Sequence, residues 1–326
     1  MRTSVSNEGS LQRSVTRGGR RYNGPMEAKK QTISGYFDQI AADYARLYDD
    51  ANLSRYPSGP IRLRKALNLL QGLVPSGLVV DVGCGTGHTA LELVRRGYGV
   101  RGIDISAEMV ERSRRLLAEH APTADSRFEV GDVEQMPLGG GSADGAVALG
   151  LIEYLDDDAP LASELARILR PGGAAVIAFR NRLFNLFSLN QYTQAEVAAG
   201  TYGQLLDEYI EESKRPWPEG TVRRWAAELA AAAEPIAQAA ARPPHALKPM
   251  PVHLRQHTPA QTRAIFSRAG FEVDEIVYFH FHALPPAFEA QAGEGYHRAG
   301  LAMEVLEKTG VGCAMASAFL LPIRRR

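Results

Sequence analysis

The sequence predicts a doubly wound α/β fold built on a mostly parallel sheet, and three observations support that prediction. A buried strand over residues 78–82 ends in a glycine-rich turn and leads into a helix. Further apolar strands follow, separated by amphipathic helices and without hairpin signals, which is typical of a parallel sheet covered on both faces. Residues 182–258 interrupt the alternation, which predicts a helical insertion after strand five, before two more strands bring the number to seven.

The first strand and its turn form the predicted ligand-binding element. Asp81 lies among apolar residues of the strand, and Gly83, Gly85 and Gly87 follow at a spacing of two. Glycine in this pattern permits backbone conformations that a Cβ forbids, and it allows a ligand to approach closely. The free N–H groups of the next helix face the same turn. In a doubly wound fold this arrangement predicts a nucleotide-like ligand at the carboxyl end of the strand.

The other elements follow from the spacing of apolar residues. Further strands are expected over residues 100–105, 127–133, 144–151, 174–179, 271–282 and 312–323. Helices are expected over residues 33–48, 61–70, 89–96, 161–169, 191–206, 223–241, 259–269 and 288–309. Strand two ends in Asp104, a position from which a carboxylate can reach the first turn and accept hydrogen bonds from a ribose diol.

This order predicts four regions. They are a disordered basic tail over residues 1–30, a ligand-binding core with its leading helices over 31–181, a helical lid over 182–258, and the remainder of the core sheet over 259–326. Insertions placed after a central strand commonly cover the carboxyl edge of the sheet. The alternative is a helical decoration without ligand contact. The Arg- and Ser-rich tail would also suit an organelle transit peptide.

Composition narrows the class of protein. The 326 residues include 37 Lys and Arg against 37 Asp and Glu, so no net field attracts nucleic acid. Only two cysteines occur, Cys84 and Cys313, which disfavours a disulfide framework. No apolar run reaches the length of about 18 residues that a membrane span needs. We expect a cytoplasmic globular protein without a membrane span, and the oligomeric state stays open.

A metal site is not expected. Asp, Glu and His residues show no tight cluster with ligand spacing, and His253, His257 and Asp132 are too scattered in the chain to indicate one.

The ordered set of motifs closely resembles the class I methyltransferases that use S-adenosylmethionine, in particular those acting on small molecules. The set comprises Asp81-x-Gly-x-Gly-x-Gly, a strand ending in Asp104, Gly-Asp132-Val133, and Leu-Arg-Pro-Gly-Gly at 169–173. The resemblance covers residues 33–180 and, in layout, the last strand-helix-strand. It implies a Rossmann-like sheet whose last strand is antiparallel. Position 88 is histidine where a dinucleotide fingerprint has its third glycine, which disfavours a nicotinamide cofactor.

The resemblance implies roles for residues at the methionine end and at the ribose of the cofactor. The glycine turn would pass the methionine part, and Asp81 would help to orient its amino group. Asp104 would bind both ribose hydroxyls. Gly150 and Leu151, which follow strand four, match the position that passes the sulfonium.

The same resemblance implies an adenine site and a covering helix. Asp132 and Val133 would bracket the adenine through its amino group and ring nitrogen, and Ile105 and Met109 would pack against its face. The leading helix resembles one that closes over the cofactor in small-molecule members. Tyr44 would be a lid contact there, or alternatively a packing residue.

The implied reaction is an SN2 displacement onto an O, N or C atom of a small-molecule acceptor, with the cofactor carrying the chemistry. A base is required only when the acceptor is a hydroxyl, a phenol or a carbon acid. The candidates are Glu153 and Tyr154 after strand four, and His280 and His282, which share a face by period-two alternation. Many family members carry Glu-His where this chain has Glu153-Tyr154. Packing is the alternative role for the histidines.

The acceptor and two rival functions remain open. The Leu, Phe, Tyr and Trp content of residues 182–258 favours an apolar or aromatic acceptor, such as a natural-product, quinone or lipid precursor. The first rival is a non-catalytic protein that binds S-adenosylmethionine or S-adenosylhomocysteine. The second is a nicotinamide-dependent oxidoreductase.

Overall fold

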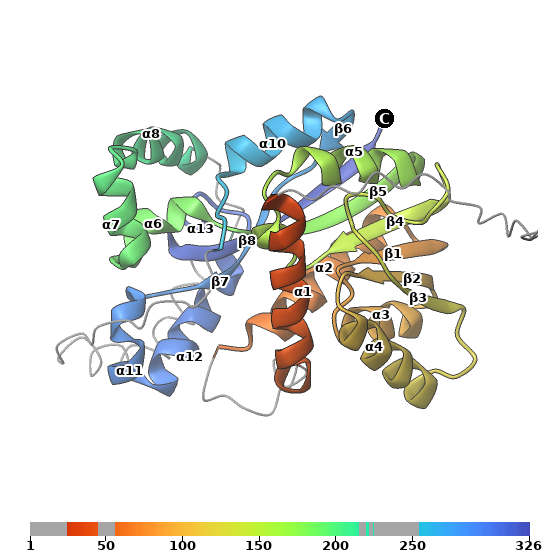
Figure 1. Ribbon diagram of the computed structural model, residues 1–326. Helices are drawn as coiled ribbons and strands as arrows, with labels where there is room; N and C mark the ends of the chain where they lie inside the picture. Colours follow the sequence, from red (N-terminus) through yellow and green to blue (C-terminus); the bar gives the residue numbers. More distant parts are fainter. Residues whose placement is uncertain (1–24, 45–55, 215–219, 222–223, 225–253) are drawn as a thin grey trace, which may run out of the picture.

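The computed structural model describes residues 25–44, 56–214, 220–221, 224 and 254–326 (Figure 1). The strands are β1 Leu78–Val82, β2 Gly99–Asp104, β3 Ser126–Val130, β4 Ala143–Ala148, β5 Leu169–Arg180, β6 Phe271–Val273, β7 Val277–Phe281 and β8 Ala316–Arg325. They form one sheet in the order β3-β2-β1-β4-β5-β8-β6, with β7 also paired to β8. Strands β1 to β5 are parallel and β8 is antiparallel to β5. The predicted fold class is confirmed.

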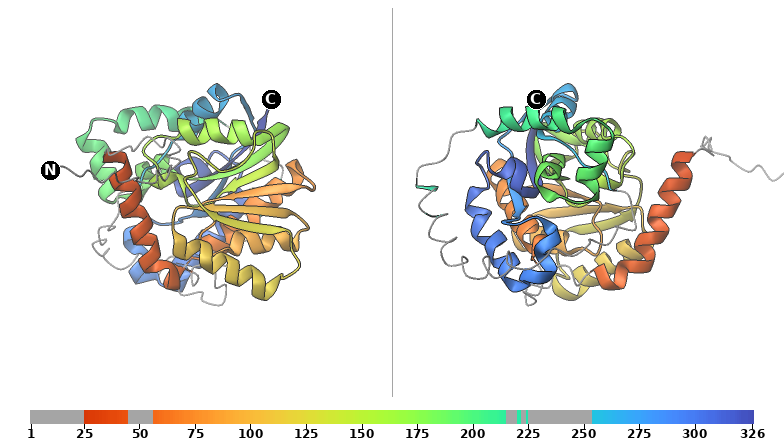
Figure 2. Two further views of the ribbon diagram at one scale, coloured as in Figure 1. Left: turned by 45° about the vertical axis from the view of Figure 1, so that its right-hand side comes forward. Right: turned by 90° about the vertical axis from the view of Figure 1, so that its left-hand side faces the viewer.

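Helices cover both faces of the sheet (Figure 2). Two hydrophobic cores lie between the sheet and these helices. One core contains side chains of α2 Ser58–Leu73, α3 His88–Arg95 and α4 Ala107–His120. The other contains side chains of α5 Ala159–Ile168 and α10 Pro259–Arg268. Successive residues of β1 point to opposite faces, so Val79 enters the first core and Val80 the second. Burial on both faces explains why the strand sequences are continuously apolar.

The antiparallel pair β5 and β8 extends the parallel sheet. Their register runs from Ala174 opposite Arg324 to Arg180 opposite Ala318. Phe179 lies directly opposite Phe319, and the two rings stack with centroids 5.3 Å apart. Cross-strand aromatic pairs of this kind stabilise a register because a shift by one residue would move every side chain to the other face.

The strand predicted over residues 271–282 is two strands. Both β6 and β7 pair with β8, one after the other along the same edge, so they share one position in the sheet. The interruption lies opposite Pro322, whose carbonyl accepts a hydrogen bond from the N–H of Asp274. Proline has no N–H to return to the ladder, which explains why regular pairing stops there.

Two C-terminal predictions also differ from the structure. The helix predicted over residues 288–309 is divided into α11 Glu289–Ala292, α12 Glu294–Ala302 and the 3-10 turn η5 Met303–Leu306, after the short turn η4 Pro286–Phe288. Gly293 has a φ of 51°, which ends α11 and redirects the chain. The last strand is preceded by the short helix α13 Gly312–Met315. A Cβ at Gly312 would lie 2.5 Å from the ring of Tyr278, so only glycine permits this packing.

The leading helix α1 spans Pro25–Tyr44. Its first six residues, 25–30, fall within the predicted tail. Proline is well suited to the first turn of a helix, which agrees with a start at Pro25. Residues 1–24 of that tail lie outside the described residues. Tyr44 is the last residue of α1, and its side chain lies outside the described part of the chain.

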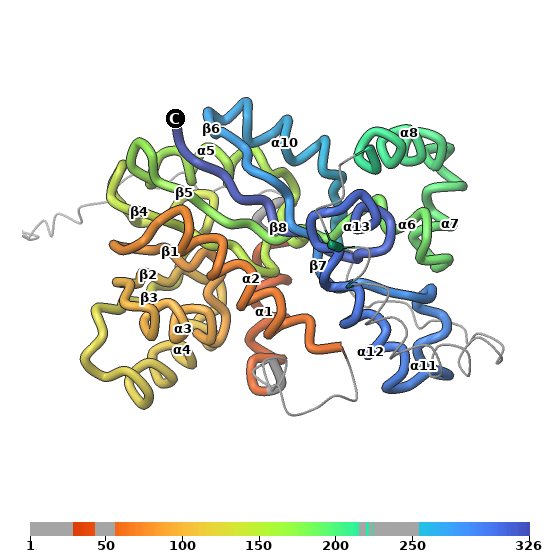
Figure 3. Tube along the Cα trace, turned by 180° about the vertical axis from the view of Figure 1, so that it is seen from behind, coloured from red at the N-terminus to blue at the C-terminus, as the bar shows by residue number. Residues whose placement is uncertain are grey.

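The insertion contributes the turn η3 Arg182–Phe184 and the helices α6 Asn185–Ser188, α7 Gln191–Ala198 and α8 Tyr202–Ser213. The single helix predicted over residues 191–206 is two, because Gly200 takes a φ of 70° between them. These helices and α11 and α12 lie at the end of the sheet farthest from β3 (Figure 3). The helix predicted over residues 223–241 falls almost entirely outside the described residues.

Within the described ranges, no helix combines the length and the apolar character needed to cross a membrane.

Candidate functional site

A cavity lies between the carboxyl ends of the parallel strands and α1, enclosing about 820 Å³ of empty space that is partly open to solvent. Most of the predicted binding residues line it: Gly83, Gly85, Asp104, Ile105, Met109, Asp132, Val133, Gly150, Leu151 and Tyr154. The structure adds Lys29, Lys30, Ile33 and Phe37 from α1. Asp81, Gly87, Glu153, His280 and His282 do not line it.

The glycine turn has the backbone conformation that its composition predicts. Gly83, Gly85 and Gly87 have φ values of 74°, 52° and 88°, which non-glycine residues rarely adopt. The N–H of Gly83 donates to the carbonyl of Ile103, 2.8 Å away, and joins the turn to β2. Gly87 acts at the back of the turn, where a Cβ would lie 2.9 Å from the Cα of Ser113 in α4. Gly87 therefore influences the conformation of the turn without lining the cavity.

Asp104 connects the glycine turn to the end of β2. Its Oδ2 accepts a hydrogen bond from the N–H of Gly85 and its Oδ1 accepts one from the N–H of Ser106, both at 2.9 Å. Burial raises the pKa of Asp104 above its ordinary value. A carboxylate oxygen has two lone pairs, so each oxygen retains the capacity to accept one more hydrogen bond from a ligand.

Asp81 is fully buried beside this turn, and its Oδ2 has no hydrogen-bond partner among the described residues. Burial, with the negative charge of Asp104 as a further cause, raises the pKa of Asp81 to about 8. Buried polar atoms are nearly always hydrogen-bonded in folded proteins. The orphaned carboxyl oxygen of Asp81 can therefore pair with a ligand group that reaches the turn.

The far end of the cavity carries a pair of acids bridged by α1. Asp132 accepts a hydrogen bond from the N–H of Glu134 at 2.9 Å. Lys30 Nζ lies 2.6 Å from Asp132 Oδ2 and also pairs with Glu134, while Lys29 pairs with Asp156. These contacts place α1 across the mouth of the cavity. The sequence predictions placed both lysines in a disordered tail, and no local signal in the chain would have identified them.

Further contacts fasten α1 along the cavity. Ser34 Oγ donates to the carbonyl of Ile105 at 3.2 Å, and Ser106 Oγ lies 2.5 Å from Asp38 Oδ1. The ring of Phe37 meets the ring of Tyr154 edge to face, with centroids 5.1 Å apart. The residues of α1 that line the cavity lie between Lys29 and Phe37, and the predicted lid contact of Tyr44 falls outside the described side chains.

Tyr154 and Glu153 follow β4 in the turn η2 Ile152–Tyr154. Burial, together with the charge of Glu153, raises the pKa of Tyr154 to about 12. The phenol is therefore protonated at neutral pH. Glu153 is half-buried, and its carbonyl accepts a hydrogen bond from the N–H of Arg255 at 3.0 Å.

His280 and His282 lie together, with ring centroids 4.7 Å apart. His280 has a φ of 60° and stacks on Tyr56, while His282 Nδ1 lies 2.7 Å from the hydroxyl of Tyr296. Burial lowers the pKa of His280 to about 3 and lowers the pKa of His282 well below its ordinary value. Both imidazoles are neutral at neutral pH, and such low values make them weak proton acceptors.

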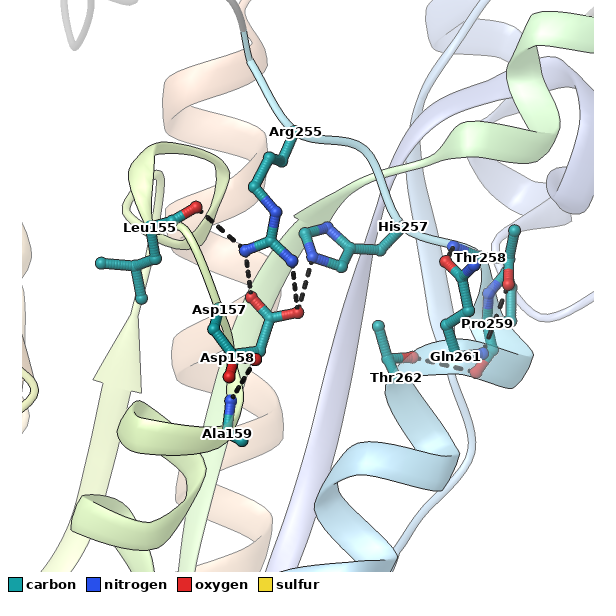
Figure 4. Close-up of polar contacts among 10 residues, drawn as sticks. All are labelled: Leu155, Asp157, Asp158, Ala159, Arg255, His257, Thr258, Pro259, Gln261 and Thr262. Carbon is teal, nitrogen blue, oxygen red and sulfur yellow. Dashed lines mark hydrogen bonds and ion pairs between the residues drawn. The ribbon is translucent and has the colours of Figure 1, made fainter. Parts of the chain in front are cut away.

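A buried cluster that the sequence did not reveal joins the loop after β4 to the segment before α10 (Figure 4). Asp158 receives two hydrogen bonds from Arg255, at 2.7 and 3.1 Å, and lies 2.8 Å from His257 Nε2. Arg255 also donates to the carbonyl of Leu155 at 3.0 Å. The cluster thus fixes the loop after β4, whose residues Tyr154 and Leu155 line the cavity. Its members are too far apart in the chain for local spacing to reveal it.

No group of three or more His, Cys, Asp or Glu side chains within the described ranges is arranged to hold a metal ion.

Comparison with known proteins agrees with this geometry. A family profile described as "Methyltransferase domain" matches residues 80–177. An O-methyltransferase from Pyrenophora dematioidea is 36% identical over 118 residues, which are 35% of this chain and 44% of that protein. A demethylmenaquinone methyltransferase from Beutenbergia cavernae is 30% identical over 204 residues, 60% of this chain and 80% of that protein.

A solved structure of magnesium protoporphyrin IX methyltransferase from Synechocystis PCC 6803, with bound S-adenosylhomocysteine, has a TM-score of 0.53. It is 16% identical, over 91% of this chain and 100% of that one, so it supports the fold alone. The chain spans 44%, 37% and 38% of the first three curated relatives that it matches. With the coverage of the Beutenbergia relative, the profile and the site geometry, the chain belongs to the class I S-adenosylmethionine-dependent methyltransferases.

Proposed function

We propose that this protein transfers a methyl group to a small organic acceptor. S-adenosylmethionine supplies the activated methyl group. The main support for the proposal is the pair of buried carboxyl groups at the glycine turn, Asp81 and Asp104. Asp104 faces the cavity with spare acceptor capacity on both oxygens, and Asp81 holds an oxygen that lacks a partner among the described residues.

The chemistry of these groups matches the polar groups of the cofactor. Asp81 would pair with the ammonium of the methionine part, which supplies the donor that its orphaned oxygen lacks. Asp104 would accept from the two ribose hydroxyls. Asp132 and Val133 would hold the adenine edge, with Met109 against its face. The residues given these roles come from different elements: β1, β2, α4 and the loop after β3.

The apolar wall of the cavity excludes water. Ile33 and Phe37 of α1 line the cavity together with Leu151 and Tyr154. Exclusion of water protects a reactive methyl donor from hydrolysis and strengthens electrostatic interactions within the site. In the described part of the chain, α1 rather than the insertion forms this cover. The O-methyltransferase from Pyrenophora and the demethylmenaquinone methyltransferase from Beutenbergia favour a small molecule as the acceptor, and the first of them favours an oxygen atom.

Two measurements on the full-length protein test the proposal. Calorimetric titration with S-adenosylhomocysteine tests the cofactor site, and incubation with methyl-labelled S-adenosylmethionine and a source-cell extract tests the transfer. We expect saturable binding and a labelled small molecule. Asp104→Asn should abolish both, whereas Asp125→Asn, which changes an exposed aspartate at the opposite end of the strands, should change neither. Binding without labelling of any acceptor would refute the proposal and indicate a non-catalytic binding protein.

A further inference from the structure

Two arginines lie beside the wall of the cavity that Gly150 and Tyr154 form, outside every role assigned above. Arg62 belongs to α2 and Arg180 ends β5. In β5, Val176 and Ala178 belong to the hydrophobic core that includes α2, so alternation directs Arg180 toward the same face of the sheet. Both guanidinium groups therefore approach from the α2 side.

Gly150 brings Arg62 against the wall of the cavity. A Cβ at Gly150 would lie only 2.7 Å from Nη1 of Arg62, and Gly150 itself lines the cavity with a φ of 84°. The glycine thus permits this close approach, whereas a larger residue would have to displace the guanidinium group. This is the position that the family resemblance places beside the sulfonium.

The two arginines lie close to the same groups. The positive charge of each one lowers the pKa of Tyr154, which lines the cavity, and the pKa of His280. The Nε of Arg180 is buried without a hydrogen-bond partner among the described residues. Glu304 lies nearby, but it is held by Lys65 at 2.9 Å and by Tyr56.

Of the candidate bases named from the sequence, Tyr154, His280 and His282 are unsuited to proton removal at neutral pH, and Glu153 does not line the cavity. Tyr154 has a pKa raised to about 12, His280 has one lowered to about 3, and the pKa of His282 is lowered as well. An efficient general base has a pKa near the working pH. The surroundings therefore suit an acceptor that arrives already ionised.

We infer that the acceptor is a carboxylic acid, bound as its carboxylate by Arg180 and Arg62, and that a carboxylate oxygen receives the methyl group. This inference rests on the proposed function. The guanidinium fork matches the two oxygens of a carboxylate. The anionic oxygen already holds the electron pair for the new bond to carbon. As the O–C bond forms, the bond between the methyl carbon and the donor sulfur would break, and its electron pair would stay on sulfur in the neutral thioether S-adenosylhomocysteine. The positive charge of the donor and the negative charge of the carboxylate thus cancel, a neutral methyl ester forms, and no proton has to move.

The test uses full-length protein and a source-cell extract divided on an anion-exchange resin. Each fraction is incubated with methyl-labelled S-adenosylmethionine, and the products are treated with alkali, which releases labelled methanol from methyl esters. We expect labelling only with the retained, acidic fraction, and release of the label by alkali. Arg180→Gln and Arg62→Gln should each lower kcat/KM at least about tenfold, the loss expected when one ionic hydrogen bond to a carboxylate is removed.

Arg64→Gln is the matched control, because Arg64 is an exposed arginine on the same helix as Arg62. It should leave kcat/KM unchanged, and all three variants should bind S-adenosylhomocysteine as tightly as the wild type. Labelling from the unretained fraction, or an alkali-stable product, would overturn the inference while leaving methyl transfer intact. Weakened S-adenosylhomocysteine binding in Arg180→Gln and Arg62→Gln would overturn it too, by assigning the arginines to the cofactor. Labelling of neither fraction would refute the proposed function itself.

Discussion

Asp158 Oδ2 lies 2.8 Å from Nε2 of His257, although 99 residues separate them in the chain. Both side chains are almost fully buried, with 1% and 3% of their surface exposed. Arg255 completes the cluster and donates to the carbonyl of Leu155, so the chain that returns from the insertion holds the loop after β4 in place. Leu155 and Tyr154 both line the cavity. The stability of this wall thus depends on a contact between distant segments.

Replacement of Asp158 by Ala should lower the free energy of unfolding by about 3 kcal/mol, because it leaves the half-buried Arg255 and the buried His257 without their partner. Burial alone would raise the pKa of Asp158, but hydrogen bonds from His257 and Arg255 outweigh it and lower that pKa. The carboxylate therefore contributes stability above its unfolded pKa of about 4, and that stability is lost as the pH falls through the lowered value. Chemical denaturation at several pH values measures both effects. Asp157→Asn, at the exposed neighbouring position, should change neither.

Binding of S-adenosylhomocysteine at neutral pH should release close to one proton from Asp81. The pKa of about 8 keeps this carboxyl mostly protonated in the free protein, and pairing with the ligand's ammonium favours the ionised form. Calorimetry in buffers of different ionisation enthalpy counts the protons released. Asp81→Asn should eliminate the release, and an unchanged proton count in that variant would assign the proton to another group.

The raised pKa of Asp81 also predicts how the free protein responds to pH. The folded state retains a proton that the unfolded state has lost, so this residue makes the folded protein less stable as the pH rises from about 4 toward 8. Asp81→Asn should remove that part of the pH dependence. Thermal unfolding of both proteins across this range is the measurement, and parallel curves would contradict the expectation.

Lys30→Gln should speed the release of S-adenosylhomocysteine by up to about fivefold, since a partly exposed ion pair contributes at most about 1 kcal/mol. The reason is that Lys30 joins α1 to Asp132 and Glu134 across the mouth of the cavity. Release in the wild type should also quicken with added salt, which screens such pairs. Stopped-flow displacement reports both rates. Lys214→Gln removes an exposed lysine of the insertion and should leave release unchanged.

His280→Asn should lower kcat by less than about fivefold and leave the pH profile unchanged between about pH 6.5 and 8.5. The imidazole is already neutral throughout this range, because burial has lowered its pKa to about 3. Asn is chosen because it tolerates the left-handed backbone at this position better than most residues. A loss of about a hundredfold or more, with an altered pH profile, would show instead that His280 is the catalytic base.

Much of the cofactor site was predictable because it is local in the sequence. A strand, its glycine turn and the next helix are contiguous, so Gly83, Gly85 and Asp104 could be assigned from spacing, and the structure places all three in one cavity. The parallel order of strands follows from the same alternation of elements. The break between β6 and β7 could not be predicted in this way, because Pro322, which lies opposite the break, belongs to β8.

The sequence by itself determined the fold class, the glycine turn and the acids at the ends of the strands. Only the tertiary structure decided which distant groups meet there. Asp158 with His257, Lys30 with Asp132, and Arg62 against Gly150 are contacts between elements remote in the chain. The physical reason is that hydrophobic periodicity reports which face of an element is buried, but not which partner lies opposite a polar side chain. That pairing depends on the packing of the whole sheet and its helices.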